Sequence, residues 1–306
     1  MKYVIGVDGG GTKTAFALAD ETGKLLAQTV LPSISYREHG MEKVASRLRS
    51  GTENLLSTVG IAPKQVSAAA IGAPGYGENA QGDALLAETV RQAFQGIQTV
   101  LVNDAQIACY GALSGRPGIN IVAGTGSIAY GEDGKGGAAR SGGWSERFSD
   151  EGSCYWLGKM TMSLFCKEAD GRAPKDALYH ILREALTLAD DMSFITVAEK
   201  EYLPYRSKVA SFQKYLLQAA QQGDEAAKSL YAAAGRELSL LAAGVRAQLS
   251  FEGTVEVSLT GGLTHAGALI EEPLRELLSR QGMKYSPSEG SPLEGAVRLA
   301  CMTLKS

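Results

Sequence analysis

The sequence predicts an α/β fold built from two similar domains, and two observations carry this prediction. Short β-branched runs alternate with stretches of helical apolar spacing, which is typical of a sheet with crossover helices. A pattern of strand, glycine turn, strand and Gly-Lys turn also occurs twice, as VDGGGTKTAFALADETGK and as VAGTGSIAYGEDGK. We interpret this repeat as a duplicated architecture, with one domain over residues 1–115 and 290–306 and the other over residues 116–289.

The first half of the chain alternates between strand and helix patterns. Strands are expected over 4–7, 15–19, 25–30, 67–73 and 99–102, and helices over 41–59, 83–94 and 104–113.

The second half begins with two more strand patterns and is then rich in helices. Strands are expected over 119–123, 128–131 and 255–259, and helices over 153–168, 175–188, 209–221, 225–249 and 292–303.

The composition argues against several classes of function. The chain has 306 residues, is 44% hydrophobic and carries a formal net charge of -3, which is ordinary for a globular protein and offers no basic surface to nucleic acid. No apolar run approaches the roughly 20 residues of a membrane-spanning helix, and the first residues lack a secretory pattern. Cys109, Cys154, Cys166 and Cys301 are widely spaced, so we expect reduced thiols and a cytoplasmic location.

Two glycine turns carry the chemistry of the sequence. The first reads Gly9-Gly10-Gly11-Thr12-Lys13-Thr14 and follows Asp8, and the second reads Gly124-Thr125-Gly126-Ser127. Glycine lets a phosphate approach backbone N–H groups, hydroxyls add donors, and lysine adds a point charge for a β- or γ-phosphate. One such turn fits a plain β-hairpin equally well, but two of the same kind favour a nucleotide clamp.

Two familiar phosphate motifs do not fit these turns. The P-loop needs lysine directly after its second glycine, whereas Thr12 precedes Lys13 here. The dinucleotide fingerprint needs a third glycine or alanine where this chain has Thr14. Both motifs also open a helix, and the residues after this turn have a strand pattern instead.

Three motifs in order resemble the superfamily that hexokinase-type sugar kinases share with actin and the large heat-shock chaperones. Residues 8–14 are similar to its first phosphate motif, residues 123–127 to its second, and Leu259-Thr260-Gly261-Gly262-Leu263 to its adenosine motif. The stretch GGWSERFSDEGSCYWLG, residues 142–158, more closely resembles the BadF/BadG/BcrA/BcrD-type ATPase family and its N-acetylglucosamine kinase-like branch. The resemblance implies two actin-like (ribonuclease H-like) domains, each a mixed sheet with flanking helices, around a central nucleotide cleft.

Asp8 and Asp104 are the candidate acids of this site. Asp8 ends a strand beside the phosphate turn, where we expect it to hold Mg²⁺ through water, with turn capping as the alternative. Asp104 starts a helix, and from the residues alone an N-cap is an equally good interpretation. The resemblance implies that Asp104 contacts the sugar as the catalytic base, accepting the proton of the hydroxyl that attacks the γ-phosphate.

The resemblance also implies that Asp150, Gly143, Trp144 and Ser145 line the sugar pocket. A carboxylate accepts two hydroxyl hydrogens, and an indole with glycines gives a flat wall for the ring. From position alone, Asp150 is an ordinary acid near a helix N-terminus. The kinase branch carries an asparagine in the loop after its third strand, whereas loop 31–40 here reads LPSISYREHG. This departure leaves open whether the acceptor is N-acetylglucosamine or glucosamine.

We therefore expect an ATP-dependent kinase that phosphorylates a hydroxyl of an amino sugar, with ATP and Mg²⁺ as cofactors. Its partner is then a small-molecule sugar, with no nucleic acid and no membrane, and a homodimer stays an open alternative. An ATPase that activates an electron-transfer partner through an iron–sulfur cluster would need exposed thiolates, and Cys109 and Cys154 lack a glycine-rich setting. A non-enzymatic, actin-like nucleotide switch would not bring Asp104 and Asp150 to one cleft.

Overall fold

The computed structural model describes residues 2–304 and divides the chain into two compact units. Unit 1 joins the residues up to Pro117 with those from Pro287 onward, and unit 2 is Gly118–Ser286. These bounds lie within a few residues of the expected domain bounds. Within the described residues, no helix is both long enough and apolar enough to cross a membrane.

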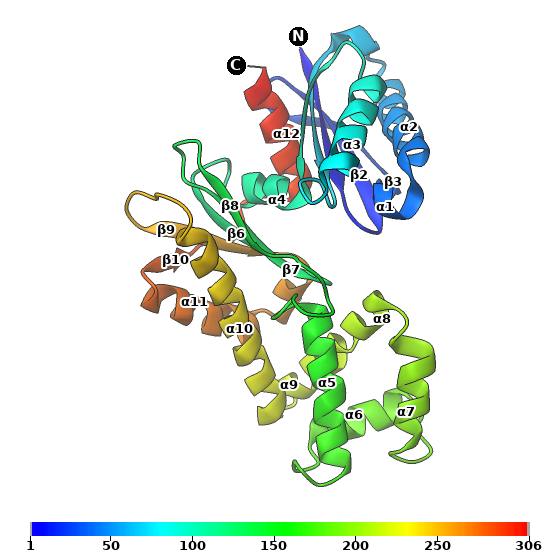
Figure 1. The fold of residues 1–306 in the computed structure, drawn as a ribbon, viewed down its shortest axis with the longest axis vertical. Coiled ribbons are helices and arrows are strands. Elements are labelled where there is room, and N and C mark those ends of the chain that lie inside the picture. The colour runs from blue at the N-terminus through cyan, green and yellow to red at the C-terminus, as the bar shows by residue number, and fades with distance from the viewer. Residues whose placement is uncertain (1, 305–306) are drawn as a thin grey trace. The chain divides into compact units, whose positions relative to one another are not determined.

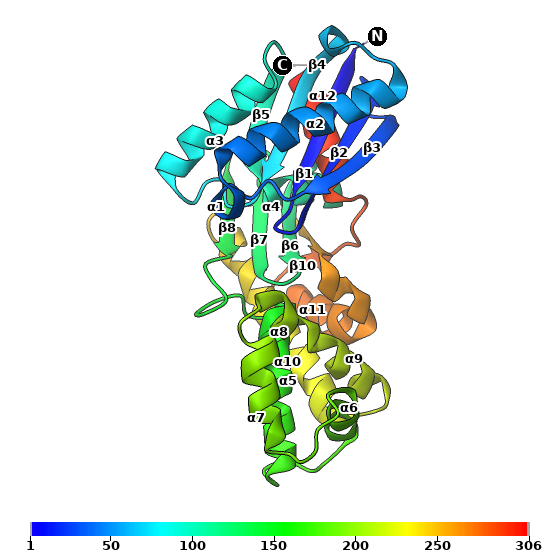
Figure 2. The same ribbon diagram turned by 90° about the vertical axis from the view of Figure 1, so that its right-hand side faces the viewer.

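Unit 1 is built on a mixed five-stranded sheet of order β3-β2-β1-β4-β5. β1, β2 and β3 form an antiparallel meander, whereas β4 and β5 run parallel to β1 (Figure 1, with all five strands labelled in Figure 2). The strands are β1 (Tyr3–Gly9), β2 (Lys13–Asp20), β3 (Leu25–Pro32), β4 (Val66–Ala73) and β5 (Gln98–Asn103).

Helices cover both faces of this sheet. They are α1 (Tyr36–His39), α2 (Met41–Val59), α3 (Ala80–Ala93), α4 (Asp104–Ala112) and α12 (Pro292–Thr303), with a short 3-10 turn at Pro63–Gln65. Figure 2 shows α2 and α3 in front of the sheet and α12 behind it. Leu48 of α2 packs with Phe16 on the first face, while the second face is rich in alanine, including Ala68 and Ala70. These small side chains let α12 lie close to the strands.

Unit 2 repeats the same sheet. Its order is β10-β9-β6-β7-β8, with β6, β7 and β8 as the antiparallel meander and β9 and β10 parallel to β6. The strands are β6 (Gly118–Ala123), β7 (Ser127–Glu132), β8 (Ala138–Gly142), β9 (Val255–Thr260) and β10 (Met283–Tyr285). The predicted fold class, two mixed sheets with flanking helices, is confirmed.

The helices of unit 2 enclose one large apolar core. Ile119 and Val257 of the sheet share this core with Leu238 and Val245 of the longest helix. The helices are α5 (Cys154–Ala169), α6 (Ala177–Ala185), α7 (Ser193–Val197), a π-helix (Ala198–Tyr202), α8 (Arg206–Ser211), α9 (Gln213–Gln221), α10 (Glu225–Arg246), a 3-10 helix (Gly262–Ala266) and α11 (Ala268–Arg280).

Several expected elements differ from the structure. The helix expected over 209–221 is two helices, α8 and α9, which meet at the fully buried Phe212. α11 is not among the expected helices; it contains Pro273, a residue that usually interrupts a helix. β8 is not among the expected strands, because its residues AARSG lack an apolar alternation.

The core of unit 2 holds an unpaired carboxyl group. Glu168 of α5 is fully buried, and neither of its side-chain oxygens has a partner at good hydrogen-bond geometry among the described residues, although the nearby backbone N–H of Tyr179 partly offsets the burial of its charge. Asp224 and Asp176, the N-cap residues of α10 and α6, add negative charge nearby. Burial, and then these two charges, raise the pKa of Glu168 from its ordinary 4.5 to about 7. The folded protein therefore holds this proton more tightly than the unfolded chain does.

This raised pKa predicts that the protein loses stability as the pH rises from about 4.5 through about 7. The proton on Glu168 stabilises the fold below this range, and its loss leaves a buried charge above it. In Glu168→Gln this dependence should shrink by on the order of 2 kcal/mol. Urea unfolding at pH 5 and pH 8 measures it, with Glu184→Gln, an exposed acid of α6, as the matched control. Equal pH dependence in the wild type and Glu168→Gln would contradict the assignment.

Candidate functional site

The first glycine turn joins β1 to β2 and is braced from the loop that follows β3. The backbone N–H of Gly10 donates to the carbonyl of Lys13 at 2.9 Å, which closes the turn. The Ser33 hydroxyl donates to the carbonyl of Gly10 at 2.7 Å, and the backbone N–H of Ile34 donates to Thr14 Oγ1 at 3.0 Å. The loop without the expected asparagine thus holds the first glycine turn in place.

The three glycines of this turn have different surroundings. A Cβ on Gly9 would lie 2.7 Å from the carbonyl oxygen of Gly72 and from the side chain of Ile34, so the packing of β1 requires glycine there. A Cβ on Gly10 would lie 3.2 Å from the Lys13 carbonyl, and one on Gly11 would have no neighbour within 4 Å. The fold therefore explains Gly9, whereas Gly11 faces open space.

The carboxyl ends of three parallel strands bring Asp8 and Asp104 to the same edge of the unit 1 sheet. Asp8 on β1 pairs in register with Gly72 on β4, and Ala73 pairs with Asn103 at the end of β5. Asp104 follows Asn103 as the first residue of α4. Adjacent parallel strands that end together place these two acids near one another.

Burial shifts the acid–base properties of both carboxyl groups. Burial, and then the negative charge of Asp8, raise the pKa of Asp104 from 3.8 to about 6; the charge of Glu78 contributes less, and the backbone N–H of Ala105 opposes the shift. Burial also raises the pKa of Asp8, while the nearby Lys13 ammonium lowers it. Ionising either of these acids at the edge of the unit 1 sheet therefore costs free energy.

Asn103, and not Asp104, is the N-cap residue of α4. The Asn103 side chain accepts from the backbone N–H of Ala105 at 2.9 Å and donates from Nδ2 to the carbonyl of Tyr76 at 2.8 Å. Asp104 Oδ1 shares the same Ala105 N–H at 3.0 Å. Because Asn103 supplies the cap and anchors the loop after β4, the Asp104 carboxylate is left with other acceptor positions.

Close contact between α4 and α12 fixes the helix that begins with Asp104. A Cβ on Gly111 would overlap the carbonyl oxygen of Ser291, and one on Gly295 would overlap the carbonyl oxygen of Ile107. The two backbones can approach this closely only because both positions are glycine. The position of Asp104 therefore depends on the packing of the C-terminal helix.

The loop between β4 and α3, residues 74–79, contacts the residues around Asp104. Its Glu78 pairs with Arg37 at 2.9 Å, which ties this loop to α1. Glu78 also adds to the negative potential at Asp104. Together with the Asn103–Tyr76 bond, these contacts make the loop part of the surroundings of the candidate base.

The second glycine turn joins β6 to β7 in unit 2 and is bonded to the start of α5. The backbone N–H of Gly124 donates to the carbonyl of Gly126 at 2.9 Å. The backbone N–H groups of Cys154 and Tyr155 donate to the carbonyls of Gly124 at 2.9 Å and Thr125 at 3.2 Å. Helix N–H groups that would lack a partner are thereby satisfied, and the turn is held rigidly.

Asp150 lies against this second turn. Its carboxylate accepts from the backbone N–H of Ser127 at 3.3 Å and from Arg206 Nη2 at 2.5 Å. The Ser127 hydroxyl donates to the carbonyl of Glu151 at 2.7 Å. Burial raises the pKa of Asp150, although Arg206 and the Ser127 N–H counteract it. Arg206 is not among the predicted site residues, because a lone arginine 56 residues from Asp150 forms no recognisable motif with it.

The third motif lies next to the second turn. β6 and β9 are parallel, with Val122 in register with Thr260, so Gly261 follows β9 where Ala123 ends β6. Gly261 has φ +98°, and a Cβ there would lie 2.5 Å from the carbonyl oxygen of Ala123. A Cβ on Gly262 would have no neighbour within 4 Å. The second and third motifs thus share one edge of the unit 2 sheet.

The expected sugar-binding loop follows β8. Gly143 has φ +68°, and Trp144 is 74% exposed, with the Arg140 guanidinium 6.0 Å from its ring centroid. Ser145 accepts at its carbonyl from the backbone N–H groups of Phe148 and Ser149, which closes the loop. Trp144 therefore offers an open aromatic face, while Asp150 at the end of the same loop is buried.

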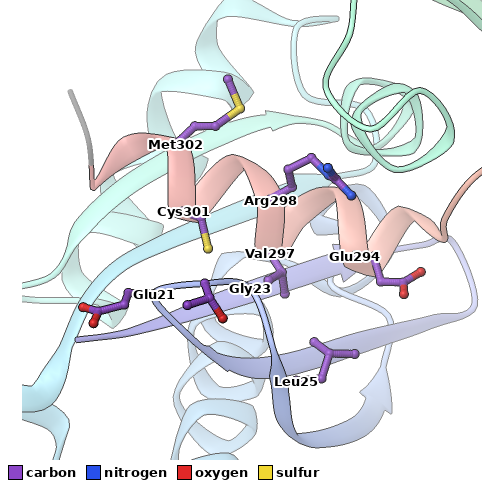
Figure 3. A pocket seen from close by; sticks show the side chains of 9 residues that line it. Glu21, Gly23, Leu25, Glu294, Val297, Arg298, Cys301 and Met302 are labelled. Atoms are coloured by element: carbon purple, nitrogen blue, oxygen red, sulfur yellow. The ribbon is translucent and has the colours of Figure 1, made fainter. Parts of the chain in front are cut away.

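A separate pocket of about 340 Å³ lies in unit 1, where the turn from β2 to β3 faces α12 (Figure 3). None of its lining residues is a predicted site residue. They are Glu21, Thr22, Gly23, Leu25, Glu294, Val297, Arg298, Cys301 and Met302.

Burial bears on whether Cys109, Cys154 and Cys166 could serve as metal ligands. Cys109 is buried in α4, and burial raises the pKa of the Cys154 thiol to about 11. A metal ligand must be the thiolate, so burial disfavours Cys154 in that role. Burial raises the pKa of Cys166 as well.

Comparison with known proteins identifies the relatives of this chain. The model of the BadF/BadG/BcrA/BcrD ATPase family matches residues 5–300. The N-acetylmuramic acid/N-acetylglucosamine kinase of Clostridium acetobutylicum is 30% identical over 262 residues, which are 86% of this chain and 85% of that protein. The N-acetyl-D-glucosamine kinase of Dictyostelium discoideum is 28% identical over 294 residues, 93% of this chain and 91% of that one.

Solved structures show the same fold. A crystal structure from Chromobacterium violaceum, provisionally named an N-acetylglucosamine kinase, has a TM-score of 0.76 at 27% identity and covers 98% of this chain and 99% of that one. A ROK family glucokinase from Streptomyces griseus has a TM-score of 0.60 at 19% identity, covers 99% of this chain and 100% of that one, and shows the likeness of fold alone.

Proposed function

Because the chain belongs to the BadF/BadG/BcrA/BcrD ATPase family, we propose that it is an ATP-dependent kinase that phosphorylates a hydroxyl of an amino sugar. Family membership implies the use of ATP. Relatives that align over most of the chain are named as kinases of N-acetylglucosamine or N-acetylmuramic acid, which supports the amino sugar. The observation that carries the proposal is Asp104, a partly buried carboxyl group whose pKa is raised and which lies beside Asp8 at the first turn.

We assign ATP to the three glycine motifs. Gly9 to Thr14 would receive the phosphates in unit 1, as would Gly124 to Ser127 in unit 2. Gly261 and Gly262 would lie against the adenosine, since they share the sheet edge of the second turn. Backbone N–H groups, hydroxyls and the Lys13 ammonium are suitable phosphate donors.

The acids of unit 1 suit a magnesium ion bound together with the nucleotide. Burial makes the charged forms of Asp8 and Asp104 costly, and a divalent cation would offset this cost. Among the described residues there is no cluster of three or more acidic, histidine or cysteine ligands, which fits an ion that keeps several waters and binds phosphate oxygens. When bound, Mg²⁺ neutralises charge on the phosphates.

Asp104 acts as the general base in this proposal. With a pKa of about 6 it is ionised at neutral pH, yet it accepts a proton more readily than an ordinary aspartate does. The Asn103 cap and the contact of α4 with α12 hold it in a fixed orientation. Phosphoryl transfer asks mainly for positioning and charge stabilisation, which these contacts supply.

Gly143, Trp144, Ser145 and Asp150 are the proposed sugar contacts. The exposed indole of Trp144 suits stacking against a sugar ring. Asp150 makes two hydrogen bonds within the protein, and a carboxylate has further acceptor positions for hydroxyls. The choice of N-acetylglucosamine or glucosamine as the acceptor stays open, because loop 31–40 holds no asparagine.

A coupled ADP-release screen tests the proposed function. We expect glucosamine or N-acetylglucosamine to raise ADP release well above the sugar-free rate, and above the rate with glucose. N-acetylmuramic acid and N-acetylmannosamine complete the panel, since they vary the substituents at two ring positions. If ATP is bound and no sugar raises ADP release, the kinase proposal is wrong and a nucleotide switch is favoured.

Replacing Asp104 by Asn should lower kcat by a factor on the order of 10² or more, because the amide cannot accept the proton. ATP affinity should stay near that of the wild type, since Asp104 does not lie in a glycine turn. Steady-state kinetics and calorimetry with a nonhydrolysable ATP analogue measure the two effects. Glu53→Gln, an exposed acid of α2, is the control. Turnover within a few-fold of the wild type would remove Asp104 from this role.

A further inference from the structure

An ion pair lies directly against the backbone of the second glycine turn. Arg206, the first residue of α8, donates from Nη2 to Asp150 Oδ2 at 2.5 Å. A Cβ on Gly126 would lie 2.5 Å from Arg206 Nη2 and 2.8 Å from Asp150 Oδ2. The pair therefore packs against Gly126, and a side chain at this position would have to displace it.

The two partners of this pair are exposed to very different degrees. The Asp150 side chain is 4% exposed, whereas that of Arg206 is 44% exposed. A buried carboxylate without a compensating charge is costly. The positive charge of Arg206 is the strongest influence that lowers the pKa of Asp150. Glu146 is the other acid that faces Arg206, 3.7 Å from Nε. Arg206 thus serves two acids while it remains accessible to water on one side.

The Asp150 carboxylate links this arginine to the turn. Its Oδ1 accepts from the backbone N–H of Ser127, where the turn enters β7. Asp150 also has φ +61°, a left-handed conformation that a non-glycine residue adopts only when its surroundings hold it there. The contacts of its carboxylate with Arg206 and Ser127 are suited to hold it.

We propose that Arg206 is a positioning residue of the second phosphate turn: it keeps the Asp150 carboxylate ionised and oriented, and Asp150 in turn holds the Ser127 end of the turn. This inference rests on the proposed function, because it assigns the turn to ATP. Arg206 acts through Asp150 and needs no contact with nucleotide or sugar. Because one charged N–H group of Arg206 makes the contact with Asp150, a lysine at this position should restore part of its effect.

Nucleotide affinity of Arg206→Gln tests the inference without any sugar turnover. Calorimetry with a nonhydrolysable ATP analogue and Mg²⁺ at pH 8 should show Kd raised by about tenfold or more, with part of the affinity regained in Arg206→Lys. Lowering the pH to 6 should weaken binding to Arg206→Gln more than to the wild type. Without its counter-charge Asp150 takes up a proton at a higher pH, which weakens its hydrogen bond with the Ser127 N–H. Lys208→Gln, on the exposed side of α8, is the control, because it removes one positive charge just as Arg206→Gln does.

Two results would overturn the inference. One is an Arg206→Gln affinity within twofold of the wild type at both pH values. The other is a loss of affinity that Arg206→Lys does not relieve and that has the wild-type pH dependence, which indicates a general structural defect. The proposed kinase function is judged separately: a wild type that binds nucleotide and phosphorylates no sugar contradicts that function, while the Arg206 comparison still gives its result.

Discussion

The partial burial of two like charges at one sheet edge is the constraint on which the candidate site depends. Asp8 lies near the end of β1 and Asp104 directly after β5, and the charge of Asp8 adds to the cost of ionising Asp104. Several hydrogen bonds hold this arrangement in place, including those of the Asn103 side chain with the Ala105 N–H and with the Tyr76 carbonyl. A cation and an acceptor hydroxyl would both lower its energy, which is what the proposed reaction brings to the site.

Glycine makes this geometry possible in two ways. At Gly9, Gly111 and Gly295 the backbone packs so closely that no side chain fits, and these contacts fix β1 and α4. At Gly11 and Gly262 a Cβ would have no neighbour within 4 Å, so packing does not explain glycine there. The close approach of the proposed nucleotide to the backbone would explain it.

The sequence allowed the prediction of the sheets, the turns and the first acids, because each leaves a local pattern. Alternation of strand and helix patterns indicated both sheets, and α2 and α12 have the expected bounds. Long-range contacts leave no such pattern: Arg206 meets Asp150 only through the fold of the helices of unit 2. The bracing of the first turn by Ser33 and the negative charge that Glu78 adds near Asp104 were unpredictable for the same reason.

Carboxyl titration of Asp104 by NMR, in the ligand-free wild type and in Asp8→Asn, tests the central claim most directly. With ¹³C-labelled aspartate, Asp104 should titrate near pH 6 in the wild type. In Asp8→Asn its midpoint should fall, because a like charge is removed, and should stay above the ordinary 3.8 because burial persists. An Asp104 midpoint near 4 in the wild type, or one that Asp8→Asn leaves unchanged, would contradict the account.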